Sequence, residues 1–385
     1  MGFRERVIRE NELLWNMDNQ GKPIVFWGIG NSMKAVKEAL EKKGIVPTAF
    51  CDNNMDIVGT YIENIPVFSY EQIRERYTDY ILILTVAINN AIPIMKQLRE
   101  QKEEHPVYHI EHSFKVEDGF LEYSYLEEHK DEFEVIYQAL KDEKSQDIFV
   151  QNINFKLSGN KIPLLDYVDG DSFFDKTLMP VSEHYSYMDV GAYTGDTLLR
   201  FYAFCGGMYD KLYAVEPDSG NYDALNKVVK YGRLGNVKTF HVGGWNVKGE
   251  LTFYTVTNKN AINFDSPNFF KDMQHTAPNS WEIDKSDYGK ETMQVDTVDN
   301  LLQGAKCDVI KINALAADYQ VLMGCRETIK EYKPILVGEF GTQKEYVTAL
   351  LSEIIKMNPN YKIYIRQKMI FGDCKTVYYA IDSNR

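Results

Sequence analysis

The chain has 385 residues and a net charge of −13, because 43 Lys and Arg face 56 Asp and Glu. An acidic chain repels phosphate backbones and its lysines are scattered among acids, so we expect no nucleic acid partner. No apolar stretch approaches the roughly 18 residues of a membrane span, and the charged first residues lack a signal-peptide core. The 5 cysteines stand far apart without zinc spacing, so we expect no metal site and a reducing, cytoplasmic location.

The first region predicts a small α/β domain. Residues 23–30, PIVFWGIG, form an apolar strand that ends in two glycines, and residues 31–44 continue with helical spacing. Further strands are expected at 47–52 and 79–86, and the next helix is expected at NNAIPIMKQLREQ. Because strand and helix alternate, we predict a Rossmann-like, doubly wound unit over residues 1–113.

This first domain contains a candidate nucleotide site. Gly28 and Gly30 would let a phosphate approach the helix that starts near Asn31, and Asp52 lies where a dinucleotide fold places its ribose-binding acid. Met33 occupies the position of the third fingerprint glycine, so the match is partial. One interpretation is a site for NAD or a nucleotide sugar, and the other is a tight turn without a ligand.

Residues 20–110, with FWGIGNSMKAVKEAL, FCDNN and IPVFSYEQI in order, resemble the small Rossmann-like domain of bacterial sugar-modifying proteins. There this domain often accompanies a glycan enzyme. Residues 114–164 follow with apolar residues at helical spacing and acids between them. We therefore predict a helical connector over 114–164 and a third region over 165–385.

The third region repeats the α/β pattern. Residues 185–190, YSYMDV, predict a strand, and Gly191–Asp196 predicts the turn into a helix. Residues 211–217, KLYAVEP, predict a second strand that ends in an acid, and residues 237–244, VKTFHVGG, predict a third. The fold class is therefore α/β, with two doubly wound units in tandem.

The turn of the third region favours an adenosyl ligand. Gly191 and Gly195 remove side chains so that the backbone can close over a ligand. The Glu216 carboxylate can accept hydrogen bonds from both ribose hydroxyls. Asp189 and Asp196 place two negative charges in the loop, which disfavours a pyrophosphate and favours a cation. S-adenosylmethionine carries a sulfonium and an ammonium, so this composition indicates it rather than NAD.

The motifs MDVGAYTGDT, YAVEPD, HVGGW, MQVDTVDNLL, CDVIKI and YKPILVGEF are similar, in that order, to those of FkbM-type methyltransferases over about residues 165–382. The resemblance implies a class I methyltransferase fold, with a seven-stranded sheet whose last strand is antiparallel. It implies S-adenosylmethionine as cofactor and S-adenosylhomocysteine as product. The residues that it places around the cofactor are Asp189, Gly191, Ala192, Tyr193, Thr194, Gly195, Asp196, Thr197, Glu216, Pro217, Asp218, Gly243, Trp245 and Asn313.

The chain departs from this family after the fourth strand. The family usually has Ile-Lys-Ile-Asp, an apolar residue and Glu-Gly-Ala-Glu, whereas residues 310–318 are IKINALAAD. Asn313 replaces the Asp and Leu315 replaces the first Glu, and an amide cannot take a proton near neutral pH. The predicted catalytic residues are Glu339, Lys311 and Asn313, with Glu339 as the preferred base or acceptor contact. His241 and Asp318 are further candidates for a base.

Residues 257–289 form a long insert, which we predict to be a lid near the cofactor. The leading hypothesis is O-methylation of a hydroxyl on a sugar or other polyhydroxylated metabolite, so the expected partner is a small-molecule or glycan acceptor. A second hypothesis is an impaired relative that binds an adenosyl ligand or a glycan partner without turnover. A third is a nucleotide-sugar oxidoreductase. The sequence leaves the acceptor, the oligomeric state and any metal requirement open.

Overall fold

The computed structural model describes residues 2–8, 21–42, 44–110, 121–158, 160–170, 173–256, 270–271, 288–314, 317–340, 346–368 and 376–384. The chain divides into two compact units. Unit 1 comprises Met1–Tyr137, Glu143–Asp169 and Met369–Lys375, and unit 2 comprises Gln138–Asp142, Gly170–Lys368 and Thr376–Arg385. Most of the segment predicted as a connector, 114–164, thus belongs to unit 1.

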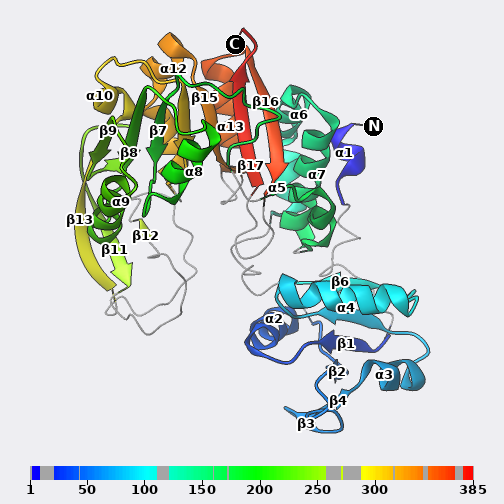
Figure 1. Cartoon of the computed structure of the whole chain (residues 1–385). Helices are drawn as coiled ribbons and strands as arrows, with labels where there is room; N and C mark the ends of the chain where they lie inside the picture. Colours follow the sequence, from blue (N-terminus) through cyan, green and yellow to red (C-terminus); the bar gives the residue numbers. More distant parts are fainter. Residues whose placement is uncertain are drawn as a thin grey trace. The chain divides into compact units, whose positions relative to one another are not determined.

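Unit 1 contains a six-stranded sheet in the order β3-β4-β2-β1-β5-β6 (Figure 1). All neighbouring pairs are parallel except β3 with β4. The strands are β1 (Ile24–Trp27), β2 (Ala49–Cys51), β3 (Tyr61–Ile62), β4 (Ile65–Phe68), β5 (Ile81–Leu84) and β6 (Val107–His109). The helices between them are α2 (Asn31–Glu41), α3 (Tyr70–Arg76) and α4 (Ile88–Glu100). The predicted alternation of strand and helix is confirmed here.

The central strands of unit 1 are buried on both faces. In β1, Val25 and Trp27 belong to one apolar cluster, whereas Ile24 and Phe26 belong to another. Successive side chains of a strand point to opposite faces, so a strand that is covered on both sides must be apolar throughout. This explains the continuous apolar run from which the strand was predicted.

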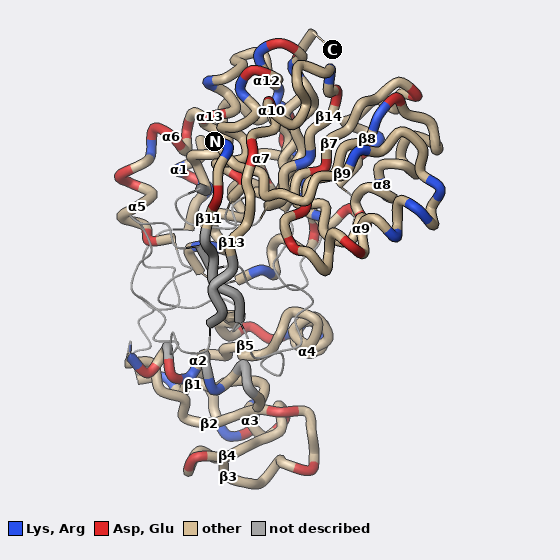
Figure 2. Tube along the Cα trace, turned by 90° about the vertical axis from the view of Figure 1, so that its left-hand side faces the viewer, with Lys and Arg blue, Asp and Glu red and all other residues tan. Residues whose placement is uncertain are grey.

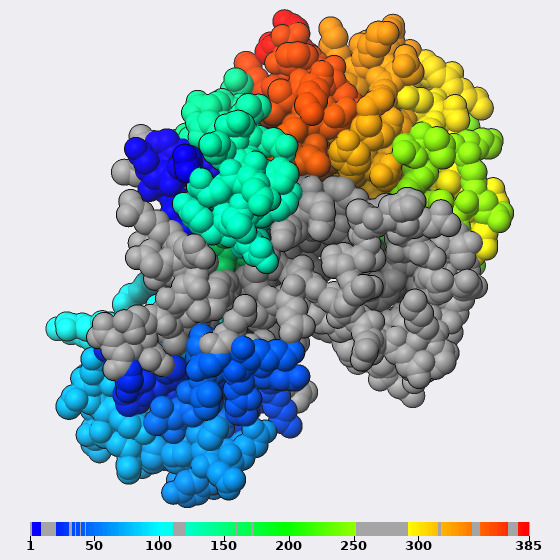
Figure 3. Space-filling view, turned by 180° about the vertical axis from the view of Figure 1, so that it is seen from behind, coloured from blue at the N-terminus to red at the C-terminus, as the bar shows by residue number. Residues whose placement is uncertain are grey.

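Further helices of unit 1 are α1 (Phe3–Arg6), α5 (Tyr123–Glu128), α6 (Lys130–Ala139, whose last residues belong to unit 2), α7 (Glu143–Ser158) and the 3-10 helix η3 (Ile162–Tyr167). Phe3 of α1 stacks on Phe133 with ring centroids 5.7 Å apart and contacts Phe149 at 5.5 Å. Figure 3 shows α1, in dark blue, against the teal surface of these helices. An aromatic cluster therefore joins the first helix to α6 and α7.

Glu103 organises a polar cluster in unit 1. Its carboxylate accepts hydrogen bonds from the hydroxyls of Tyr70 and Tyr80 and pairs with Nδ1 of His105 at 2.5 Å. The Glu103 side chain is only 4% exposed. Burial alone would raise the pKa of this carboxyl, but the hydrogen bonds from Tyr70, Tyr80 and His105 lower it to about 2.

We predict that Glu103→Gln destabilises unit 1 in a pH-dependent way. The pKa of Glu103 is lowered from 4.5 to about 2 by folding, so its stabilisation is complete above the unfolded value and is lost as the pH falls towards the folded one. Urea unfolding of wild type and variant at neutral pH and between those two pKa values measures the difference. The difference should shrink with falling pH, and Glu104→Gln, at the exposed neighbour, should show none. A gap that stays constant with pH would contradict the assignment.

Unit 2 contains a seven-stranded sheet in the order β16-β17-β15-β14-β7-β8-β9 (Figure 1). Its strands are β7 (Ser186–Val190), β8 (Lys211–Val215), β9 (Val237–Phe240), β14 (Val309–Ile312), β15 (Ile335–Glu339), β16 (Tyr361–Gln367) and β17 (Thr376–Asp382). β17 is antiparallel to both neighbours, whereas the pairs from β15 to β9 are parallel. The predicted seven-stranded sheet with an antiparallel last strand is confirmed.

The helices of unit 2 are α8 (Asp196–Phe204), α9 (Ser219–Tyr231), α10 (Val298–Leu302), α11 (Asp318–Met323), α12 (Arg326–Tyr332) and α13 (Tyr346–Met357). Among the described residues, no helix is both long enough and apolar enough to span a membrane. Because β7, β8, β14 and β15 are parallel, their carboxyl ends and the loops after them meet at one edge of the sheet.

A second sheet of unit 2, in the order β10-β13-β11-β12, corrects one prediction. Its strands are β10 (Gly243–Gly244), β11 (Gly249–Val256), β12 (Phe270–Lys271) and β13 (Tyr288–Asp296). The strand predicted at 237–244 ends at Phe240, and the two glycines pair with Val295 and Asp296 instead. They fit there because a Cβ on Gly243 would lie 2.8 Å from the Met293 sulfur. The predicted lid, 257–289, lies largely outside the described residues.

Candidate functional site

The loop after β7 has the tight geometry that its glycines predicted. Gly191 and Gly195 have φ values of 77° and 90°, in the left-handed region that glycine adopts without strain. The backbone N–H groups of Gly191 and Ala192 both donate to the carbonyl of Val215 at 3.0 Å. The loop is thereby fixed to the end of β8, and Gly195 is the N-cap residue of α8.

The glycines were predicted to make room for a ligand, but the space beside them is taken by protein atoms. A Cβ on Gly191 would lie 2.0 Å from the carbonyl oxygen of Asn313. A Cβ on Gly195 would lie 3.1 Å from Leu225 and 3.2 Å from Val228, both on α9. In these directions the absent side chains allow neighbouring loops and helices to approach, and not a ligand.

Glu216 is held in place by the backbone on both sides. Its Oε2 accepts from the N–H of Tyr193 at 2.9 Å, and its Oε1 accepts from the N–H of Asp218 at 3.0 Å. Burial raises the pKa of this carboxyl, and the bonds from Asp218 and Tyr193 oppose that effect. The Asn221 side chain donates to the same carboxylate, so three of its four acceptor positions are used and one more donor can be accepted. Tyr193 is 37% exposed and has a φ of 49°, which is uncommon outside glycine.

Asp189 and Lys311 form a buried ion pair across β7 and β14. The Lys311 ammonium donates to Asp189 Oδ1 at 2.8 Å and to the carbonyl of Gly191 at 2.7 Å. Thr197 donates to the other Asp189 oxygen at 2.5 Å. The two charged side chains are 0% and 1% exposed.

This pair corrects the charge argument made from the sequence. Asp189 does not present a free negative charge to the loop, because Lys311 neutralises it. Of the two acids in the loop, Asp189 and Asp196, only Asp196 faces solvent, in the first turn of α8. Lys311 was predicted as a possible catalytic residue, but its ammonium is buried in an ion pair with Asp189 and does not face an acceptor.

We predict that Lys311→Met lowers the free energy of unfolding of unit 2 by about 3–5 kcal/mol, because it leaves the Asp189 carboxylate buried and unpaired. The double variant Lys311→Met/Asp189→Asn should recover part of this loss, since the buried charge is then gone. Guanidinium unfolding of the wild type, both single variants and the double variant measures the coupling. Strict additivity of the two single effects would contradict the pair.

Asn313 and Glu339 meet at the carboxyl ends of β14 and β15. The Asn313 amide donates to Glu339 Oε1 at 3.1 Å, and both residues are half-buried. Asp318 is buried and accepts from the N–H of Ala314 at 2.6 Å, so it fixes the chain after β14. Leu315 lies outside the described residues. Two of the three predicted catalytic residues, Asn313 and Glu339, are thus brought into direct contact.

The other predicted cofactor residues surround the same strand ends. Pro217 and Asp218 follow Glu216, and Asp218 caps α9 by accepting from Asn221. Trp245 is half-buried, and its backbone N–H donates to the Asp296 carbonyl. Thr194 is half-buried within the glycine loop.

An aromatic pair that no sequence motif indicated lies beside this group. The rings of Tyr222 and His241 stack with centroids 4.5 Å apart, and His241 also contacts the Ser219 hydroxyl at 3.3 Å. No motif contains both residues, because one lies on α9 and the other follows β9.

The glycines predicted as a second nucleotide site lie at the corresponding edge of unit 1. Gly28 follows β1 with a φ of 109°, Gly30 is the N-cap residue of α2, and Asn31 begins that helix. Asp52 follows β2 and accepts hydrogen bonds from the N–H groups of Ile29 and Asn54. Among the described residues of either unit, no His, Cys, Asp or Glu side chains gather as a metal site.

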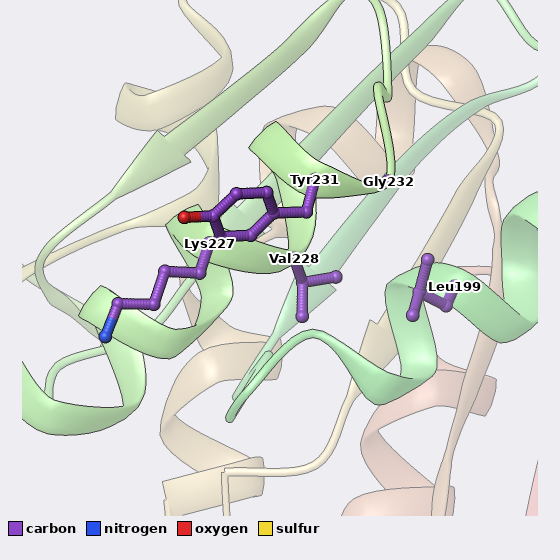
Figure 4. A pocket seen from close by; sticks show the side chains of 5 residues that line it. All are labelled: Leu199, Lys227, Val228, Tyr231 and Gly232. Atoms are coloured by element: carbon purple, nitrogen blue, oxygen red, sulfur yellow. The ribbon is translucent and has the colours of Figure 1, made fainter.

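A hollow of about 280 Å³ lies between α8 and α9. Leu199 of α8 and Lys227, Val228, Tyr231 and Gly232 of the α9 region line it (Figure 4). Figure 2 shows Lys and Arg residues in blue along the tube near α8 and α9. The hollow is almost wholly apolar, and none of the predicted site residues lines it.

Two family models match this chain, one within each unit. Residues 189–362 match the family model of the methyltransferase FkbM domain, and residues 20–105 match the model named C2185-like, N-terminal. The second match leaves the resemblance of this region to sugar-modifying proteins a prediction. A search of curated proteins finds no match to the chain.

Among solved structures, the FkbM methyltransferase from Methylobacillus flagellatus KT is similar, with a TM-score of 0.65 and 17% identity over 93% of this chain and 90% of that chain. Aeropyrum pernix fibrillarin, solved with natively bound S-adenosyl-L-methionine, covers 53% of this chain and 69% of its own, at 11% identity and a TM-score of 0.32. A Streptococcus thermophilus rRNA methylase covers 52% and 89%, at 10% and 0.32. The first of these shows that the chain has the fold of a methyltransferase.

Proposed function

We propose that unit 2 is an S-adenosylmethionine-dependent methyltransferase that acts in the cytoplasm on a hydroxyl of a sugar or another polyhydroxylated metabolite. The match to the methyltransferase FkbM domain supports the reaction class. The observation that carries the proposal is the Glu216 carboxylate, fixed at the end of β8 by two backbone N–H groups.

The residues at this edge fit an adenosyl ligand. We assign both ribose hydroxyls to Glu216, one at its remaining acceptor position and the other in place of the Asn221 side chain. The exposed Asp196 carboxylate suits a cationic group, although the charge preference now depends on this acid and not on Asp189. The half-buried Trp245 and the Tyr222–His241 stack provide flat surfaces near the same strand ends for a purine.

When bound, S-adenosylmethionine supplies a methyl group that is already activated by its positive sulfur. In the transfer, the acceptor oxygen forms a bond to the methyl carbon while the carbon–sulfur bond breaks and its electron pair stays on sulfur. The acceptor hydroxyl must lose a proton, and we assign this proton to the Glu339 carboxylate. Asn313 orients that carboxylate through its amide, which is a donor and cannot compete for the proton.

The magnitudes explain how such a site can work without the Asp and Glu that the sequence lacks. Proximity and orientation can contribute about 7–11 kcal/mol to a reaction of two bound partners. A general base typically adds a factor of about 10²–10⁴. One positioned carboxylate at Glu339 would therefore be sufficient for a base, with most of the acceleration arising from alignment.

We predict that the full chain binds S-adenosylhomocysteine and that Glu216→Ala weakens binding by a factor of about 10 or more, because two charge-assisted hydrogen bonds are lost. Isothermal calorimetry measures the affinities. Asp223→Asn, at an exposed acid on α9, should bind like the wild type. Failure of the wild type to bind at millimolar ligand would remove the proposal.

We predict that Glu339→Gln lowers kcat by about 10²–10⁴ while its S-adenosylhomocysteine affinity stays within about twofold of the wild type. The glutamine keeps the shape and can still accept from Asn313, but it takes no proton near neutral pH. The assay is transfer of a labelled methyl group to a panel of sugars and polyols. An unchanged kcat would show that Glu339 is not the base.

A second candidate function is ligand binding without turnover, and Asn313 supports it. At the position where the resemblance predicts a carboxylate, the structure has an amide that is engaged with Glu339. This candidate predicts that the wild type binds S-adenosylhomocysteine but methylates no acceptor, and that Asn313→Asp with Leu315→Glu introduces activity. Several turnovers per minute by the unmodified protein would exclude it.

A further inference from the structure

The carboxyl edge of unit 1 repeats the backbone geometry of the Glu216 site. The Gly28 N–H donates to the carbonyl of Cys51 at 2.9 Å, just as the Gly191 N–H donates to Val215. In each unit the accepting residue immediately precedes the acid at the end of the second strand, Asp52 or Glu216. The glycine loop after the first strand is thus fixed to the second strand in the same way.

The acid of unit 1 is also held in the same way. Asp52 Oδ2 accepts from the N–H of Ile29, in the glycine loop, at 3.2 Å, and its Oδ1 accepts from the N–H of Asn54 at 2.8 Å. Glu216 accepts from its own glycine loop and from the residue two positions after it. Asp52 is half-buried and each of its oxygens retains a lone pair, so it can receive two ribose hydroxyls.

The helices at this edge lack the first-turn acid that α8 has in unit 2. α8 has Asp196 in its first turn, whereas α2 and α4 have no acid in their first turns and no side chain that caps their N-termini. Both helices begin directly after the strands β1 and β5, which are neighbours in the sheet. Helix N-termini without an acid or a capping side chain favour an anion over a sulfonium.

Two buried polar side chains lie at the same edge. His109, the last residue of β6, is 1% exposed, and its Nε2 donates to the carbonyl of Val86 at 3.0 Å, directly before the N-cap residue of α4. Its Nδ1 has no hydrogen-bond partner within the described part of the chain. Because Nε2 carries the proton, Nδ1 is an open acceptor for a ligand hydroxyl.

Lys161 supplies a positive charge beside this histidine. Its side chain is fully inside unit 1, at 1% exposure, and the ammonium lies over the ring of Phe155 at 5.4 Å. Burial lowers the pKa of His109 to about 4, and the nearby Lys161 charge contributes to this lowering. The histidine therefore stays neutral at physiological pH.

We propose that unit 1 binds a nucleoside diphosphate ester at the carboxyl edge of β1, β2 and β5. Asp52 receives the ribose hydroxyls, and the N-termini of α2 and α4 face the diphosphate. Lys161 provides the compensating charge, and His109 accepts from a hydroxyl of the ligand. The two units thus share one ribose-binding geometry but differ in the charge of the ligand, which is cationic in unit 2 and anionic in unit 1.

The test is calorimetry on the full chain with the five common nucleoside diphosphates and their parent nucleosides. We expect at least one diphosphate to bind with a Kd below about 1 mM and its nucleoside to bind at least about tenfold more weakly. Nucleotide sugars and NADH of the matching base then identify the source of the ester. No binding of any diphosphate at about 5 mM, or equal binding of nucleoside and diphosphate, would overturn the proposal.

Lys161→Met should weaken the diphosphate by about 10- to 100-fold and leave the nucleoside unchanged. Lys96→Met removes the same charge from the exposed far half of α4 and should have no effect. If Lys161→Met does not fold, Asp52→Asn replaces it and should weaken the diphosphate and its nucleoside alike by about tenfold. Unchanged affinity in the folded variant would overturn the assignment.

S-adenosylhomocysteine binding to unit 2 serves as the folding control in each variant and keeps the two proposals separate. Loss of nucleotide binding with intact S-adenosylhomocysteine binding concerns unit 1 alone. The reverse result would concern only the methyltransferase function.

Discussion

The hydrogen bond from the Tyr193 N–H to Glu216 is the constraint on which the site of unit 2 depends. It requires the loop after β7 to turn back over β8, and this turn requires left-handed backbone at Gly191, Tyr193 and Gly195. In return, a carboxylate that burial disfavours is fixed by two backbone N–H groups and the Asn221 side chain at the edge where parallel strands end. A ligand that donates hydroxyls fits this arrangement because the carboxylate is already held in place to receive them.

The interior beneath this edge is electrically balanced. Lys311 neutralises Asp189 and also holds the Gly191 carbonyl, so one ammonium ties β14 to both β7 and its loop. The exposed Asp196 and the half-buried Glu339 are therefore the acids that a ligand or acceptor would meet. This separates two kinds of acid that look alike in the sequence: one that builds the strand pair and others that face outward.

The sequence predicted the elements well because each depends on local patterns. Buried strands such as β1 and β14 are continuous apolar runs, and the acid-tipped second strand follows from its position after the glycine turn. What it could not predict are the partners. Lys311 and Asp189 are far apart in the chain, and the pairing register of β14 with β7 alone brings them together.

The same holds for the glycines and for the end of the third strand. Gly191 is required by the Asn313 carbonyl, which a loop far along the chain contributes. Gly243 and Gly244 continue an apolar pattern after β9, but their small size is used by a different sheet. Asn313 was interpreted as a loss of a catalytic acid, and the structure gives it a contact of its own with Glu339. Each of these depends on packing between distant segments.

The most direct test is a crystal structure of the full chain soaked with S-adenosylhomocysteine. The account predicts density for the ligand at the carboxyl edge of β7 and β8, with both ribose hydroxyls within hydrogen-bond distance of Glu216. A ligand seated elsewhere in unit 2, or a Glu216 carboxylate that makes no contact with the ribose, would contradict it.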